Sequence, residues 1–111
     1  MAMYADLYAD QGSYFSAVIN VGNGAIDTNL TGYTARGKIR KSYSSSTYYD
    51  FVISIPQPTS GQVQIALASA VTGGIKPGRY LYDVEIVHTA TGKVTRVAEG
   101  QIDFSPSVTY T

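Results

Sequence analysis

The chain has 111 residues, the length of a single domain, and its eight basic residues balance eight acidic ones at zero net charge. It contains no cysteine, which excludes disulfide bonds and thiolate metal sites. Zero net charge disfavours nucleic acid as a partner, because phosphate binding needs a basic surplus. Charged residues make up only 14% of the chain, and ten tyrosines accompany three phenylalanines. We therefore expect one β-rich domain over residues 1–111.

Hydrophobic residues recur at every second position along most of the chain, which predicts β-strands. In chain order, the expected strands cover residues 4–8, 15–21, 33–40, 49–55, 62–67, 80–87 and 94–104. In the last of these we expect Val94 and Ala98 on the buried side and Val97 on the opposite side.

Glycine, proline and polar residues separate these runs and predict turns. The turns are expected at 22–24, at 56–61 and at 89–93, where Gly92 would take the left-handed position. Residues 68–74 could form one helical turn that ends at glycine. Six or seven short strands with such turns indicate an antiparallel sandwich or barrel.

The residues that could carry catalysis are few. His88 is the single histidine and ends a predicted strand, and no Gly-x-Ser-x-Gly motif accompanies it. Asp83 and Glu85 share one strand face, and Glu99 could lie across from them. Such carboxylates could support glycosidic acid–base chemistry, but a solvated face that balances nearby cations is the favoured interpretation. We expect no enzyme, no metal site and no cofactor.

Arg36, Lys38 and Arg40 form a basic strand face next to Lys41, and this face is the best candidate for a nucleic-acid site. We interpret it instead as a charged sheet surface and expect no nucleic-acid partner. The first residues lack the basic and apolar regions of a secretory signal peptide. No apolar stretch approaches the roughly 20 residues that cross a bilayer, so we expect no membrane insertion.

Tyrosines point to a contact surface. Residues 43–49 combine tyrosine with serine, the mixture that binding loops favour. One core cannot comfortably hold all ten tyrosines, because each buried hydroxyl needs a partner. We therefore expect surface tyrosines that bind other subunits or copies of this chain, with strand edges as a second route. The candidate interface residues are Tyr4, Tyr8, Tyr43, Tyr48 and Tyr110.

A further motif lies at Gly78, Tyr80 and Tyr82. Its spacing is that of the tyrosine corner of immunoglobulin-like domains, in which the tyrosine hydroxyl bonds the backbone a few residues upstream. Tyr82 then occupies the position that a disulfide cysteine fills in antibodies. The motif indicates an all-β, immunoglobulin-like antiparallel sandwich of about seven strands.

A wider pattern of short segments covers nearly the whole chain, and they are DQGSYFS (10–16), DTNLTGYT (27–34), ARGKIRK (35–41), GQVQIAL (61–67), PGRYLYD (77–83), GKV (92–94), EG (99–100) and SPSVT (105–109). In this order the segments resemble the small immunoglobulin-like β-sandwich domains of tailed-bacteriophage virions, most closely those of cyanophages. Such domains occur alone and as N-terminal modules of baseplate upper proteins.

The resemblance implies a virion structural protein, assembled in the host cytoplasm, that binds other virion proteins in the tail or baseplate. Capsid decoration is the nearest alternative. Another class of function is a carbohydrate-binding module, with Tyr43, Tyr48 and Tyr49 as stacking platforms.

Overall fold

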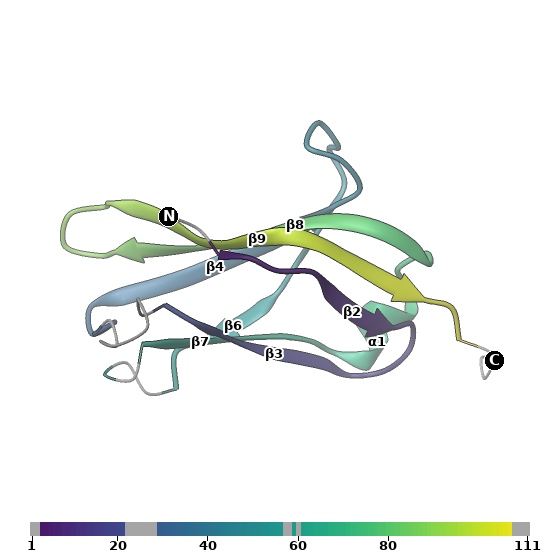
Figure 1. The fold of residues 1–111 in the computed structure, drawn as a ribbon, viewed down its shortest axis with the longest axis horizontal. Helices are drawn as coiled ribbons and strands as arrows, with labels where there is room; N and C mark the ends of the chain where they lie inside the picture. The colour runs from purple at the N-terminus through teal and green to yellow at the C-terminus, as the bar shows by residue number, and fades with distance from the viewer. Residues whose placement is uncertain (1–2, 22–28, 57–58, 60, 108–111) are drawn as a thin grey trace.

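The computed structural model describes residues 3–21, 29–56, 59 and 61–107, which form two β-sheets packed face to face (Figure 1). The predicted all-β sandwich is confirmed. The elements are β1 (Met3–Tyr4), β2 (Leu7–Asp10), β3 (Phe15–Asn20), β4 (Tyr33–Arg40), β5 (Tyr48–Asp50), β6 (Val52–Ser54), β7 (Gln62–Leu67), α1 (Ser69–Gly73), β8 (Gly78–His88) and β9 (Val94–Ser105).

The order of strands is that of an immunoglobulin-like sandwich. The larger sheet runs β1-β9-β8-β4-β5, with β2 also on β9, and the smaller sheet runs β3-β7-β6. In immunoglobulin lettering, β3, β7 and β6 stand for B, E and D, whereas β4, β8 and β9 stand for C, F and G. The pairing departs from a purely antiparallel sandwich at one edge, where β1 and β2 run parallel to β9.

The chain changes sheets within residues 49–55, which the sequence predicts as one strand. Tyr49 of β5 pairs with Ile39 in the larger sheet, whereas Ile53 of β6 pairs with Ile65 in the smaller sheet. Phe51 lies at the crossing, is buried, and donates its N–H to the Gly37 carbonyl at 3.2 Å. The prediction of a single strand is wrong, because the alternation of side chains continues through the crossing and conceals it.

A β-bulge reverses two predicted orientations in β9. Val84 lies opposite Ala98, but the next residue of β8, Glu85, lies opposite Arg96. Val97 is the additional residue and is buried together with Ala98, so the prediction that it faces outward is wrong. The bulge shifts the alternation by one position, and Val94, predicted to be buried, is exposed for the same reason.

The core lies between the sheets and is closed at one end by α1. Its most buried side chains come from both sheets and from adjoining segments, and they are Leu30, Ile39, Val63, Ile65, Leu67, Ile75, Val84 and Ile102. Thr72 of α1 is fully buried, donates to the Ser13 carbonyl at 2.8 Å and accepts the Gly12 N–H at 3.1 Å. The predicted turn at 22–24 lies outside the described residues.

Candidate functional site

The larger sheet turns one face toward the core and the other toward solvent, and we call the solvent side the outer face. Neighbouring strands bring their outward side chains into register across it. One cross-strand row contains Arg36, Glu85 and Arg96, and a second contains Asp50, Lys38, Asp83 and Glu99. The loop between β4 and β5 rises above this face (Figure 1).

Ion pairs neutralise most of the charge on the outer face. Nε of Arg36 lies 2.9 Å from Oε1 of Glu85, and Nζ of Lys38 lies 2.6 Å from Oδ1 of Asp50. Arg79 and Asp103 form a further pair at 3.1 Å. The basic strand face that the sequence predicts is therefore present, but carboxylates from β5 and β8 pair with Arg36 and Lys38. Such a surface lacks the basic surplus that a phosphate backbone requires.

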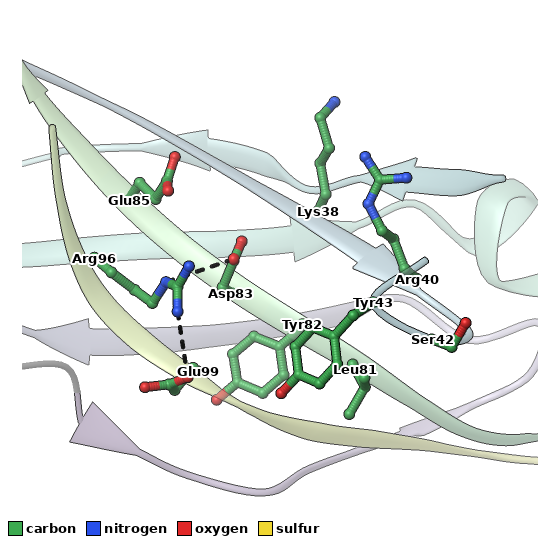
Figure 2. A pocket seen from close by; sticks show the side chains of 10 residues that line it. All are labelled: Lys38, Arg40, Ser42, Tyr43, Leu81, Tyr82, Asp83, Glu85, Arg96 and Glu99. Carbon is green, nitrogen blue, oxygen red and sulfur yellow. Dashed lines mark ion pairs between the residues drawn. The ribbon is translucent and has the colours of Figure 1, made fainter. Parts of the chain in front are cut away.

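The three carboxylates considered for acid–base chemistry have cationic partners. Arg96 reaches between Asp83 and Glu99, with N···O distances of 3.6 and 3.5 Å (Figure 2). Glu85 pairs with Arg36 instead. Burial raises the pKa of Asp83, and the Arg96 guanidinium opposes that rise. This is the arrangement of a solvated ion-pair network.

The structure brings together four of the five candidate interface tyrosines. Tyr4 lies beside Glu99 and Tyr8 beside Asp103, so both side chains point out of the sheet with the carboxylates of β9. Tyr43, in the loop between β4 and β5, lines a depression on the same face. Tyr4, Tyr8 and Tyr43 are 65%, 72% and 86% exposed. Tyr110 lies outside the described residues.

Tyr48 completes this set at the β5 edge of the outer face. It pairs with Arg40 across the strands, and Nζ of Lys38 lies 3.9 Å from the centre of its ring. Arg40 also donates to the Ser45 carbonyl at 2.6 Å, which ties the loop that carries Tyr43 to the sheet. These contacts position the ring of Tyr48 against β4 and connect the loop that carries Tyr43 to the same strand.

Tyr49 turns the other way and packs against the core. It follows Tyr48 in β5, and successive side chains of a strand point to opposite faces. The three-ring stacking platform of Tyr43, Tyr48 and Tyr49 is therefore not formed.

A depression of about 260 Å³ lies in the middle of the outer face. Its walls combine the ring of Tyr43 with the ion-paired side chains of β4, β8 and β9, and Figure 2 shows Lys38 and Arg40 standing on one side of it. Ser42 adds a hydroxyl. The depression offers an aromatic surface surrounded by hydrogen-bonding groups.

Two of the corner residues, Tyr80 and Tyr82, are buried in the core between the sheets, and Tyr82 also contributes to the lining of the depression. Tyr80 donates its hydroxyl to the Lys76 carbonyl at 2.8 Å, the upstream bond that defines a tyrosine corner, and its ring meets Phe104 edge to face. Tyr82 donates to the Ala5 carbonyl at 2.6 Å, and burial, with a smaller contribution from Asp6, raises its pKa to about 12. Gly78 begins β8 with φ of +138°, in the region that favours glycine.

His88 ends β8, as its position in the sequence predicts. Its Nδ1 lies 2.9 Å from the Thr91 hydroxyl, and its ring lies against Tyr33. Within the described ranges, no three His, Asp or Glu side chains gather as a metal site. None of the helices in this part of the chain is long and apolar enough to cross a membrane.

Sequence reasoning missed two groups of exposed residues. Tyr14, in the loop that leads into β3, is 64% exposed. Val18 and Val52 are exposed on the smaller sheet, and alternation places each outward without showing that they share a surface. No protein-family model matches the chain, and no curated protein matches it either.

Proposed function

We propose that this protein is a non-enzymatic structural subunit of a tailed-bacteriophage virion that binds neighbouring subunits through the outer face. The virion setting rests on the sequence resemblance, and we place the protein in the tail or baseplate, with capsid decoration as the nearest alternative. The observation that supports a contact role is the gathering of Tyr4, Tyr8, Tyr43 and Tyr48 on one face.

Two properties of the outer face favour a protein partner. Tyrosine supplies a large contact area with little loss of side-chain freedom, and it is enriched in interface cores. Arg36, Lys38 and Arg96 are already ion-paired within the chain, so docking would not leave these cations without partners. A neighbouring subunit could cover this face without providing a compensating charge pattern.

The test is incorporation into particles. In a phage that carries the gene, Tyr43→Ser together with Tyr4→Ser should reduce incorporation at least tenfold, because both exposed rings would be lost from the contact. Tyr14→Ser is the matched control, since Tyr14 is equally exposed but precedes a strand of the other sheet. Gold labelling of the incorporated protein should mark the tail or baseplate. Unchanged incorporation of the double variant would refute the contact role, and absence of the protein from purified particles would refute the virion assignment.

Carbohydrate binding is a second candidate, and the depression beside Tyr43 favours it. A tyrosine ring can stack on a sugar ring, while Ser42, Lys38 and Asp83 could bond its hydroxyls. Titration of the labelled protein with neutral and acidic oligosaccharides should shift the amide signals of β4 and β8, and Tyr43→Ala should abolish the shifts. Absence of shifts at millimolar sugar would exclude this candidate and leave the subunit contact intact.

A further inference from the structure

The two sheets have four edges in all, two on each sheet. These edges are not equally protected against pairing with a strand of another chain. An edge strand exposes unpaired N–H and C=O groups, so it is a template for a strand from another chain. Proteins usually guard such edges with charge, proline, a bulge or a very short strand.

Three of the edges carry such guards. The edge formed by β1 and β2 is interrupted at residues 5–6 and carries Asp6 and Asp10. β5 has three residues and ends in Asp50, which is ion-paired to Lys38. β6 also has three residues, and Pro56 follows two positions after its end.

The edge formed by β3 (Phe15–Asn20) carries none of these guards. Its six residues include no charged residue and no proline, and they pair with β7 without any shift of register. Among the strands that the structure describes, none lies on the other side of β3. A regular strand of ordinary length is therefore left open at this edge.

The surface beside this edge is also free of charge. The outward residues of the smaller sheet are Ser16, Val18 and Asn20 of β3, Gln62, Gln64 and Ala66 of β7, and Val52 and Ser54 of β6. Val18 is 55% exposed and Val52 is 68% exposed. The outer face of the larger sheet is the opposite case, since ion pairs cover it. Nothing on the smaller sheet would repel a second copy.

We infer that β3 pairs antiparallel with β3 of a second copy of this chain, joining two three-stranded sheets into one of six strands. A free strand edge is complementary to itself under two-fold rotation, so one surface serves both partners. The same two-fold pairing at the β1–β2 edge would bring Asp6 and Asp10 of one copy close to the same residues of the other. The repulsion between these carboxylates favours β3 as the edge that pairs. The inference rests on the proposed function, in which this protein works by binding other subunits. It adds a second contact surface, the β3 edge, which is separate from the surface that carries the exposed tyrosines.

The geometry of the pair identifies a sensitive residue. Side chains directly opposite each other in an antiparallel pair lie on the same face of the sheet. A two-fold axis at Val18, one of the two central residues of β3, therefore places Val18 opposite itself, with Ser16 opposite Asn20. A contact of one strand is small compared with a stable interface, so we expect a weak, concentration-dependent dimer.

The experiment compares Val18→Lys with Val52→Lys by light scattering across a concentration series. Both residues are exposed on the same sheet, but Val52 lies at its opposite edge. The unmodified chain should approach the mass of two chains, and its β3 amides should exchange hydrogen more slowly as concentration rises. Val18→Lys should raise the dissociation constant at least tenfold, because two lysines would meet across the axis, and Val52→Lys should leave it within twofold.

Thermal unfolding checks that each variant is folded. If Val18→Lys does not fold, Ser16→Lys takes its place in the experiment. A monomer at every concentration, equal effects of the two lysines, or β3 protection that appears only with another virion protein would overturn the inference. The double variant Tyr43→Ser with Tyr4→Ser separates the inference from the proposed function, because it should dimerise normally while its incorporation into particles is reduced. Loss of dimerisation in this double variant would also overturn the assignment to β3.

Discussion

Tyr82 and Gly100 face each other across β8 and β9 and meet at the same third group, the carbonyl of Ala5. The Tyr82 hydroxyl donates a 2.6 Å hydrogen bond to this oxygen, and a Cβ at position 100 would collide with it. The N–H of Ala5 in turn donates to the Glu99 carbonyl at 3.0 Å. One glycine thus allows the N-terminal edge strand, the core and the last strand to join.

Gly100→Ala should destabilise the fold and loosen the edge formed by β1. Gly100 has φ of +156°, and the new Cβ would strike the backbone of Ala5. Gly92→Ala is the control, because Gly92 also has a positive φ of +74° but open space around its Cβ. In urea denaturation, Gly100→Ala should lower the free energy of unfolding by about 1–3 kcal/mol more than Gly92→Ala. Equal losses of stability in the two variants would show that the close approach of Ala5 to Gly100 does not affect the free energy of unfolding.

Stability should fall in alkaline solution as Tyr82 ionises. An unfolded tyrosine has a pKa near 10, whereas burial raises the pKa of Tyr82 to about 12. Its contribution is complete below about pH 10, and it declines toward pH 12 because the unfolded chain releases the proton first. Urea midpoints measured from pH 8 to 11.5 should show this decline, and Tyr82→Phe should reduce it. A parallel decline in Tyr82→Phe would assign the effect to other groups.

Tyr80→Phe should lower the free energy of unfolding by about 1–2 kcal/mol, because the Lys76 carbonyl would lose its 2.8 Å hydrogen bond from the buried ring. The ring packing against Phe104 should survive, since phenylalanine keeps the same shape. Chemical denaturation measures the effect. A neutral substitution would contradict an energetic role for the corner.

Gly78→Val should destabilise the fold more than Gly73→Val. Gly78 has φ of +138°, which strains any residue with a Cβ by about 1–3 kcal/mol. Gly73 ends the short helix α1, and a Cβ there would make only an ordinary contact with Gly12 at 3.8 Å. Denaturation of both variants under one condition gives the comparison. Small and equal losses of stability in the two variants would show that the positive φ at Gly78 does not require glycine.

Arg96→Gln should raise the pKa of Asp83 further. Burial already raises this pKa, and the Arg96 guanidinium is the main group that opposes the rise. The carboxyl signal of Asp83, followed by NMR during an acid titration, should therefore move at higher pH in the variant. Lys38→Gln is the control, since Lys38 is paired with Asp50. An unchanged pKa in Arg96→Gln would mean that the 3.6 Å ion pair is not maintained in solution.

The sequence alone carries much of the fold, because alternation reveals which face of a strand is buried. Alternation predicts Ala98 on the buried side of the last strand, and Ala98 is buried. The turn at Gly92 and the helical turn ending at Gly73 also follow from local rules of backbone conformation. The exposure of Tyr4, Tyr8 and Tyr43 could be expected, since one core cannot satisfy so many hydroxyls.

Only the tertiary structure decided which strands are neighbours. A period of two contains no information on pairing, so it could not show the parallel contact of β1 and β2 with β9 or the crossing at Phe51. The bulge at Val97 depends on the register between β8 and β9, which are strands of eleven and twelve residues. The same long-range pairing placed Tyr4, Tyr8 and Tyr48 on one outer face and matched Arg36 with Glu85. It also left β3 without a neighbour on one side among the strands that the structure describes. The local pattern of the sequence determines to which face of its strand each side chain points. Which residues lie beside that side chain depends on contacts between distant segments, and these contacts form only when the two sheets pack.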